Sequence, residues 1–200
     1  MTDPHVLDFV RTSLPSPPAR VLEIGAGEGE LAVDLRGAGY DVLAIDPSST
    51  AAGVERIALI DVDEPGGSFD AAVAVVSLHH VEPLAESFEH LAELMRPGGL
   101  LAVDEFDVAR FDERAAAWWS AHHAEHPDPG ETIAGVRGHL HPVADIRDRL
   151  AAWFDLGPLE RGPYLYRFQL RAELRGEEQR SIAEGHFQAT GARFTAIRKS

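Results

Sequence analysis

Val21-Leu22-Glu23-Ile24-Gly25-Ala26-Gly27-Glu28-Gly29-Glu30 places three glycines directly after a short hydrophobic run. Residues 21–24 are predicted to form a parallel strand buried on both faces, because the run is nearly continuous. The glycines let the backbone turn sharply and approach a ligand without interference from Cβ atoms. A helix is predicted next, with its N-terminal N–H groups pointing into the same crevice. The stretch therefore predicts a strand, turn and helix that hold a nucleotide-like ligand.

The spacing of these glycines differs from the dinucleotide-binding pattern. Glu30 stands where G-x-G-x-x-G requires its third glycine, so a pyrophosphate fits poorly. Glu23, Glu28 and Glu30 add negative charge, which repels a diphosphate and favours a cationic or zwitterionic ligand. S-adenosyl-L-methionine, with its sulfonium and ammonium groups, is such a ligand. A plain tight turn is the alternative that the glycines alone leave open.

Four further motifs follow the glycine turn. An apolar run at 42–45 ends at Asp46, which lies 19 residues beyond Gly27 and precedes Pro47. The remaining motifs are a third apolar run at 57–60 leading to Asp61 and Val62, a fourth strand at 71–76 leading to Ser77, His79 and His80, and a helix end, turn and fifth strand at 94–103.

Taken in order, the five motifs resemble those of class I S-adenosylmethionine-dependent methyltransferases over residues 19–106. The closest branch is the small-molecule one that includes ubiquinone and menaquinone biosynthesis methyltransferases. The resemblance implies S-adenosyl-L-methionine as cofactor, S-adenosyl-L-homocysteine as product and a small-molecule acceptor. It also implies these cofactor-binding residues: Glu23, Gly25, Ala26, Gly27, Asp46, Pro47, Asp61, Val62 and Ser77.

Two of these residues are given particular roles by the resemblance. Asp46 is expected to accept hydrogen bonds from both ribose hydroxyls, while Asp61, with Val62, is expected at the adenine edge and face. The connection at 63–68 is shorter than is usual in the family. A solvated strand end is therefore the alternative for Asp61.

The hydrophobic pattern predicts an α/β fold independently of the resemblance. Near-continuous apolar runs alternate with helical patterns, such as the face formed by Leu84, Phe88, Leu91 and Met95. This alternation implies a Rossmann-like, doubly wound and mostly parallel sheet with helices on both faces. A further helix is predicted over residues 146–154, followed by a sixth strand at 156–161. The resemblance implies seven strands, the antiparallel C-terminal one at 192–198 lying between the fifth and the sixth.

One domain covering residues 1–200 is expected from the length. It includes a substrate-covering insertion at about 107–142 and a long connection at about 162–190, helical from 177 to 188. Pro15-Ser16-Pro17-Pro18 interrupts the short segment before the first strand, so no useful N-terminal helix is expected there. The cover over the substrate would then come from the insertions or from a second subunit, as in a homodimer.

The insertion is rich in tryptophan and histidine. Trp118 and Trp119 are either a lid over a flat acceptor or anchors for a covering helix. His122 and His126 lie four residues apart, but no third ligand stands at a recognisable spacing, so no metal site is predicted. Similarly, the alternation of Tyr164, Tyr166 and Phe168 in the long connection indicates either a strand or the lining of a pocket, and the pattern favours neither.

Candidates for an acid–base group lie after the fourth and fifth strands. Methyl transfer to a hydroxyl requires removal of its proton, and imidazole titrates near neutral pH, which makes His79 and His80 the first candidates. Simple packing of this pair in its loop is the alternative. Asp104 and Glu105 are rival bases, of which strand alternation points only one inward. In-line transfer to an oxygen, nitrogen or carbon atom depends mainly on alignment of the two reactants.

Composition restricts the class of partner. The net charge of −15 opposes binding to nucleic acid, which requires cationic neutralisation of phosphates. No run approaches the length of a membrane span, and a cytoplasmic location is expected. Absence of cysteine excludes disulfides and thiolate chemistry. Two alternative functions are a non-catalytic S-adenosylmethionine-binding partner or sensor protein and, less favoured, an NAD(P)-dependent oxidoreductase.

Overall fold

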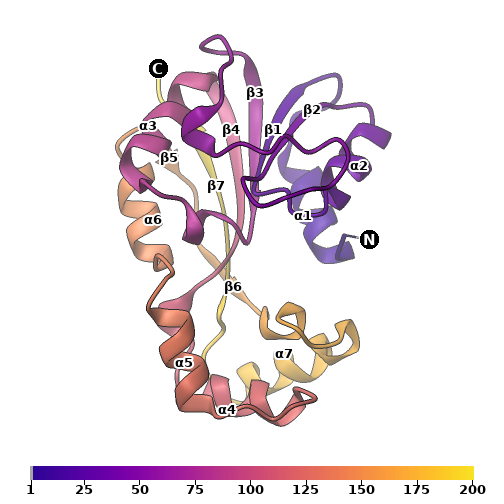
Figure 1. Ribbon diagram of the computed structural model, residues 1–200, viewed down its shortest axis with the longest axis vertical. Coiled ribbons are helices and arrows are strands. Elements are labelled where there is room, and N and C mark those ends of the chain that lie inside the picture. Colours follow the sequence, from indigo (N-terminus) through magenta and orange to yellow (C-terminus); the bar gives the residue numbers. More distant parts are fainter. Residues whose placement is uncertain (1) are drawn as a thin grey trace.

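A seven-stranded sheet forms the centre of the fold, in the order β2-β1-β3-β4-β7-β5, with β6 also paired to β7. This architecture is seen in a computed structural model that describes residues 2–200 (Figure 1). The strands are β1 (Arg20–Ile24), β2 (Asp41–Ile45), β3 (Phe69–Val75), β4 (Met95–Phe106), β5 (Phe154–Leu156), β6 (Glu160–Gly162) and β7 (Gly191–Arg198).

The helices alternate with the strands through the first half of the chain and gather after β4 in the second half (Figure 1). The α-helices are α1 (Pro4–Ser13), α2 (Glu30–Gly37), α3 (Leu84–Leu94), α4 (Glu113–His122), α5 (Pro129–Arg137), α6 (Val143–Leu150) and α7 (Arg175–Ala183). Short 3₁₀ helices are η1 (Leu59–Asp61), η2 (Leu78–His80), η3 (Val108–Arg110), η4 (Leu165–Arg167) and η5 (Ala172–Leu174).

Strand direction agrees with the predicted fold. β1, β2, β3 and β4 pair in parallel, whereas β7 pairs antiparallel with β4, β5 and β6. The C-terminal strand lies between β4 and β5, as expected from the resemblance. The doubly wound α/β fold with one antiparallel strand is therefore confirmed.

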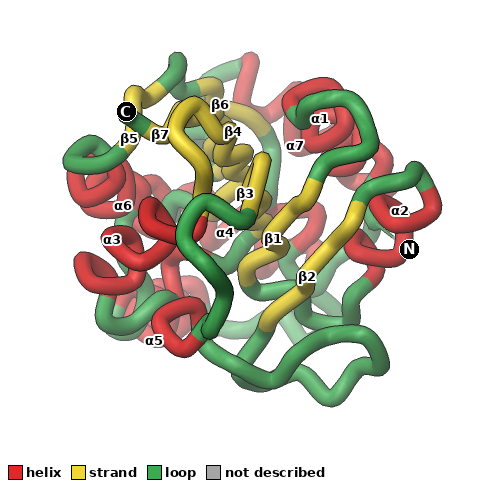
Figure 2. Tube along the Cα trace, turned by 90° about the horizontal axis from the view of Figure 1, so that it is seen from above, coloured by secondary structure: helices red, strands yellow, loops and turns green. Residues whose placement is uncertain are grey.

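Helices cover both faces of the sheet, α1 and α2 on one side and α3 and α6 on the other (Figure 2). Alternate residues of β1 serve the two layers: Val21 packs in the cluster that includes α1 and α2, while Leu22 and Ile24 pack with α3 and α6. Both faces of the central strands are thus removed from water, which explains their continuous apolar runs.

The apolar run at 57–60 does not form the expected third strand. Only Glu55 bridges to Ile45 at the carboxyl end of β2, and residues 59–61 then form η1. The chain has to run back from this end of β2 to the opposite end of the sheet, where β3 begins. It does so over the α3 face, where Leu59 and Val62 are buried in the core.

Three other boundaries differ from the sequence predictions. The expected sixth strand is two short strands, β5 and β6, separated by Gly157, Pro158 and Leu159. Helix α6 ends at Leu150, and Phe154 belongs to β5 instead of the helix. Helix α7 begins and ends earlier than predicted, at 175–183. In each case Gly or Pro residues or a short turn end an element that the apolar pattern alone would extend.

An N-terminal helix is present, contrary to expectation. Asp3 accepts hydrogen bonds from the backbone N–H groups of His5 and Val6, and Pro4 occupies the first helical turn of α1. The prolines at 15–18 follow the end of this helix and so do not interrupt it. Val6 and Val10 bury one face of α1 against the sheet.

The long connection before β7 is held by a buried carboxylate. Glu178 of α7 is fully buried and accepts hydrogen bonds from the backbone N–H groups of Tyr164, Leu165 and Tyr166 at 2.8–2.9 Å. Burial raises the pKa of Glu178. Residues 164–168 therefore form the η4 turn and its flanks instead of a strand.

A second buried carboxylate lies in β1, on the face that α1 and α2 cover. Glu23 is only 4% exposed, and its Oε2 atom has no hydrogen-bond partner among the described residues 2–200. Burial raises the pKa of Glu23 to about 8, and the opposing effect of Arg36 is smaller. The folded protein consequently retains a proton on Glu23 at pH values where the unfolded chain has lost it.

The pH dependence of stability tests this assignment. Because the folded pKa is raised, the stability associated with Glu23 is fully present below about pH 4.5 and decreases as pH rises to about 8. Glu23→Gln, which cannot ionise, should gain roughly 2–4 kcal/mol relative to wild type across this range, at about 1.4 kcal/mol per pKa unit. Urea unfolding at several pH values measures the difference. Glu28→Gln, at an exposed position, is the control, and a pH-independent difference for Glu23→Gln would contradict the assignment.

Candidate active site

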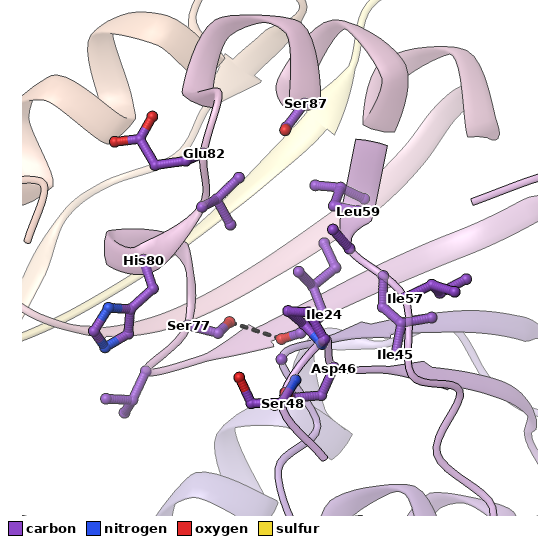
Figure 3. Close-up of a pocket in the computed structure, with 15 residues that line it drawn as sticks. Ile24, Ile45, Asp46, Ser48, Ile57, Leu59, Ser77, His80, Glu82 and Ser87 are labelled. Atoms are coloured by element: carbon purple, nitrogen blue, oxygen red, sulfur yellow. Dashed lines mark hydrogen bonds between the residues drawn. The ribbon is translucent and has the colours of Figure 1, made fainter. Parts of the chain in front are cut away.

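A cavity of about 500 Å³ lies at the carboxyl ends of β1, β2 and β3 (Figure 3). We call it the first cavity. Its walls come from the glycine turn, the segment after β2, η1 and its approach, and the segment from the end of β3 to α3. The lining residues are Ile24, Gly25, Ile45, Asp46, Pro47, Ser48, Ile57, Ala58, Leu59, Val76, Ser77, His80, Val81, Glu82 and Ser87.

The glycine turn is packed tightly against the end of β3. Gly25 has a φ of +70°, and a Cβ atom there would lie 2.3 Å from the Cβ atom of Ser77. Ser77 Oγ in turn donates a hydrogen bond to the Ile24 carbonyl at 2.7 Å (Figure 3). Only glycine satisfies both the left-handed backbone and this close approach.

Asp46 joins the end of β2 to the same turn. Its Oδ2 atom accepts a hydrogen bond from the Gly27 N–H at 2.9 Å, and its Oδ1 atom accepts from the N–H groups of Ser48 and Ser49 at 2.8 and 3.1 Å. Ser49 Oγ donates to the Gly27 carbonyl at 2.6 Å. Oδ1 thus already accepts two hydrogen bonds, whereas Oδ2 accepts one and has a second lone pair, through which Asp46 can still accept a hydrogen bond from a ligand in the cavity.

The structure brings together part of the predicted cofactor site. Gly25, Asp46, Pro47 and Ser77 line the first cavity. Ala26 and Gly27 belong to the turn beside it, and the buried Glu23 lies in the strand that leads into the turn. These three residues do not line the cavity wall.

Asp61 and Val62 are separated from the first cavity. Asp61 is exposed at the end of η1, and Val62 is buried, with its carbonyl oxygen 2.9 Å from His90 Nε2. The neighbouring residues 57–59 line the cavity in their place. The apolar character of this run was visible in the sequence, but its role as a cavity wall depends on the path of the chain after β2.

A second cavity, of about 390 Å³, shares Val76 and His80 with the first. One wall is aromatic, and in it the rings of Phe106 and Tyr164 are stacked with their centroids 4.7 Å apart. The other wall comes from α5 and the residues after it. The remaining lining residues are His79, Gly135, Val136, His139, Leu140 and Phe168.

Val76 has an unusual backbone conformation where the two cavities meet. Its φ is +53°, a value that is rare for a β-branched side chain. Its N–H donates to the Asp104 carbonyl at 2.7 Å, which ties the end of β3 to β4. Strained residues of this kind are concentrated at functional sites.

The two candidate histidines differ in their surroundings. His79 is 4% exposed, and its Nδ1 atom lies 2.5 Å from Glu105 Oε2. His80 is exposed, and its ring centroid lies 4.3 Å from that of His79. Burial, and to a smaller extent His79, lower the pKa of His80. His80 is therefore mainly neutral at pH 7.

Asp104 and Glu105 point to opposite faces of β4, as strand alternation predicts. Asp104 forms ion pairs with Arg167 and Arg193, whereas Glu105 contacts His79 on the side of the two cavities. Both carboxylates are buried and already partnered. Neither is available to a ligand as a free carboxylate.

The tryptophans of the insertion pack instead of lining either cavity. Trp119 stacks on Phe168 and donates from Nε1 to its carbonyl at 2.6 Å, and Trp118 packs against Phe187. His122 contacts the Trp118 carbonyl and Glu177, while His126 Nδ1 contacts the Ser120 carbonyl.

Residues 2–200 contain neither a candidate metal site nor a helix that could span a membrane. No three side chains of the His, Asp or Glu type come together there in a way that could hold a metal ion. In the same part of the chain, every helix is too short or too polar to cross a membrane.

Relatives with similar sequences include the ubiquinone biosynthesis O-methyltransferase of Xanthomonas campestris, 35% identical over 115 residues, which cover 50% of this chain and 48% of that protein. The demethylmenaquinone methyltransferase of Beutenbergia cavernae is 35% identical over 102 residues, which cover 46% of this chain and 42% of that protein. The chain thus spans a little under half the length of these curated relatives.

A solved structure supports the fold assignment over nearly the whole chain. An S-adenosylmethionine-dependent methyltransferase from Mesorhizobium loti superposes with a TM-score of 0.64 at 19% identity, covering 94% of this chain and 95% of that one. In addition, a family model described as a methyltransferase domain matches residues 5–132, more than half of the chain. The chain therefore belongs to the methyltransferase domain family, whose members use S-adenosyl-L-methionine.

Proposed function

We propose that this protein transfers a methyl group from S-adenosyl-L-methionine to an oxygen, nitrogen or carbon atom of a small molecule. The observation that carries the proposal is the pair of adjoining cavities, which share Val76 and His80. One cavity has the features needed for the cofactor, and the other is open to a separate acceptor. Two reactants held side by side in this way react as in an intramolecular reaction. This arrangement lowers the activation free energy by on the order of 7–11 kcal/mol.

The residues of the first cavity fit S-adenosyl-L-methionine. Its volume of about 500 Å³ is in the range of small-molecule sites. The backbone of Gly25 lines the cavity and suits the amino acid part of the cofactor, and Asp46 is positioned to accept a hydrogen bond from the ribose. Pro47 and Ser77 complete this part of the wall. The cofactor supplies a methyl group that is activated by the positive charge on sulfur.

The acidic character around the turn favours a cationic ligand. Glu28 and Glu30 lie exposed at the turn, whereas Glu23 retains its proton in the folded protein and adds no negative charge below about pH 8. We assign the adenine wall to Ile57, Ala58 and Leu59, because they line the cavity where Asp61 and Val62 do not. A backbone and apolar wall of this kind suits the flat face of a purine.

The second cavity is proposed to hold the acceptor. Its aromatic wall, with stacked Phe106 and Tyr164, favours a planar or apolar molecule. No lysine or arginine lines it, so nothing there would select a strongly anionic acceptor. His80, which the lowered pKa keeps mainly neutral at pH 7, can accept a hydrogen bond from the acceptor.

Partners of other classes are disfavoured or not required. A net charge of −15 opposes a nucleic acid substrate. The second cavity is covered by α5 and by residues near η4 of the same chain, so the proposal does not depend on a second subunit. A homodimer and a cytoplasmic location stay predictions from the sequence.

Cofactor binding is the first test. In calorimetric titrations, wild type should bind S-adenosyl-L-methionine and S-adenosyl-L-homocysteine with micromolar affinity. Asp46→Ala should weaken binding by roughly 10- to 100-fold, since a hydrogen bond to a charged group contributes about 1.5–3 kcal/mol. Gly25→Val should abolish binding, because its side chain would collide with Ser77. Asp41→Ala, at the exposed opposite end of β2, is the matched control and should bind as wild type does.

Other results of this titration would favour the alternatives. NADH binding without S-adenosyl-L-methionine binding would favour an oxidoreductase. Cofactor affinity that survives both Asp46→Ala and Gly25→Val would exclude the first cavity as the binding site. Tight cofactor binding without turnover of any phenol, aromatic amine or alcohol in a broad panel would favour the sensor alternative.

The assignment of the second cavity has its own test. Gly135 lines this cavity, and no atom lies within 4 Å of the place where its Cβ would be. Gly135→Phe should fill the cavity and reduce turnover of the best acceptor in the panel at least about tenfold, because the acceptor is excluded. The affinity of the Gly135→Phe variant for S-adenosyl-L-homocysteine should be unchanged. Gly138→Phe, just past α5 and outside the lining, is the comparison, and equal turnover in the two variants would contradict the assignment.

A further inference from the structure

Glu105 is the most heavily engaged side chain next to the two cavities. It is completely buried, and its Oε1 atom accepts hydrogen bonds from the N–H groups of Ser77 and Leu78 at 2.8 and 2.6 Å. Its Oε2 atom accepts from the Phe106 N–H at 3.1 Å and lies 2.5 Å from His79 Nδ1. Three backbone N–H groups donate to the two oxygens of this carboxyl group, so both oxygens serve as hydrogen-bond acceptors.

This arrangement determines which nitrogen of His79 carries the proton. A carboxylate can only accept hydrogen bonds, so Nδ1 must donate to Glu105. In the neutral ring the proton then resides on Nδ1, and Nε2 has a free lone pair. Within residues 2–200 no hydrogen bond is made to Nε2 of His79. His79 lines the second cavity and its Nδ1 atom is engaged by Glu105, so Nε2 is the ring nitrogen that is left for a molecule there.

His80 lacks any comparable orientation. Its ring makes no hydrogen bond to residues 2–200, and its side chain is exposed. Asp104, the other acid at the end of β4, is taken up by Arg167 and Arg193 on the opposite face of the sheet. Among these candidates, His79 alone has a fixed ring with one nitrogen left free.

We propose that His79 is the general base for a hydroxyl acceptor in the second cavity and that Glu105 is its positioning residue. This inference rests on the proposed function. The acceptor O–H bond breaks and its proton passes to His79 Nε2. The electron pair left on oxygen forms the new bond to the methyl carbon as the bond from that carbon to sulfur breaks, and its pair stays on sulfur. The imidazolium, stabilised by Glu105, then returns the proton to solvent.

Glu105 has a second consequence for the first cavity. Because it binds the N–H groups of Ser77 and Leu78, it fixes the start of η2, and Ser77 is the residue that packs on Gly25. One carboxylate therefore positions both the base and the segment against which the glycine turn is packed. A purely structural role would require only the second of these functions.

The tautomer of His79 tests the proposal without any acceptor. In ¹⁵N-histidine-labelled wild type at neutral pH, long-range ¹H–¹⁵N spectra should show His79 protonated on Nδ1, with His79→Gln used for the resonance assignment. In Glu105→Gln, the amide oxygen should take the place of Oε1, where two N–H groups donate. The amide NH₂ then faces Nδ1 and donates to it, so the proton of His79 should move to Nε2. Wild type with its proton on Nε2 would overturn the proposal, whether or not the Glu105→Gln variant folds.

Turnover with two probe acceptors, catechol and 4-nitrocatechol, tests the role of His79 as a base. The nitro group makes the hydroxyl para to it far more acidic, so 4-nitrocatechol is already ionised at pH 8 and this hydroxyl needs no base. His79→Gln should reduce kcat for catechol by about 10²–10⁴-fold, the usual contribution of a general base. The loss for 4-nitrocatechol should be less than about tenfold. The matched control is His122→Gln, which should retain turnover. His122 also pairs with a glutamate, since its Nε2 atom lies 2.9 Å from Glu177 Oε1, but it lies outside both cavities.

The two experiments separate failure of this inference from failure of the proposed function. Equal losses for both catechols in His79→Gln would mean that His79 has only a structural role, and the inference would be wrong. If wild type binds no S-adenosyl-L-methionine, the proposed function fails. Even if the proposed function fails, the tautomer of His79 shows whether Glu105 orients its ring. A proton on Nε2 would then contradict the inference independently.

Discussion

The close approach of Gly25 to Ser77 is the constraint on which both cavities depend. It is possible because Gly25 has no Cβ and a positive φ, and the Ser77 hydroxyl holds the contact through the Ile24 carbonyl. The turn after β1 and the end of β3 are therefore fixed to each other at the carboxyl edge of the sheet. The chain beyond Ser77 then leaves as η2, which carries His79 toward the second cavity and His80 to the boundary of both. A side chain at position 25 would disturb all of these positions together.

Buried carboxylates provide the second level of organisation, and each differs in its partners. Glu178 and Glu105 each receive three backbone N–H groups and thereby hold a turn, at η4 and η2 respectively. Asp104 neutralises two arginines. Within residues 2–200, Glu23 is the buried acid that keeps an oxygen without a hydrogen-bond partner, so its ionised form carries an electrostatic cost in the folded state. Buried acids with satisfied oxygens serve the architecture, and the one that is unsatisfied is the one closest in sequence to the glycine turn.

Much of the fold could be predicted from the sequence because its central strands are buried on both faces. The runs at 21–24, 42–45, 71–76 and 100–103 are strands in the structure for this reason. The prediction of a strand at 57–60 is wrong, because a run of four apolar residues looks alike in a strand and in a segment that leads into a 3₁₀ turn. Only the position of β3, at the far end of the sheet, forces that segment to run back. Helix α1 is not predicted by the sequence pattern, because the prolines at 15, 17 and 18 look like interruptions of a helix although they follow its end.

The site was predictable only where it is local in sequence. Gly25, Asp46, Pro47 and Ser77 follow directly from strand ends, and all four line the first cavity. The second cavity has no such signal, because its walls come from β3, β4, α5 and the segment around η4, which are separated by up to about ninety residues. Its central contact, Glu105 with His79, joins a strand end to a loop 26 residues away. Sequence alternation could show that Asp104 and Glu105 face opposite sides, but the choice between them depended on where two arginines from the C-terminal third of the chain lie. Because those arginines pair with Asp104 on the opposite face, Glu105 is the acid of β4 on the side of the cavities. Its oxygens are held by backbone donors, so we expect it to act through the imidazole beside it.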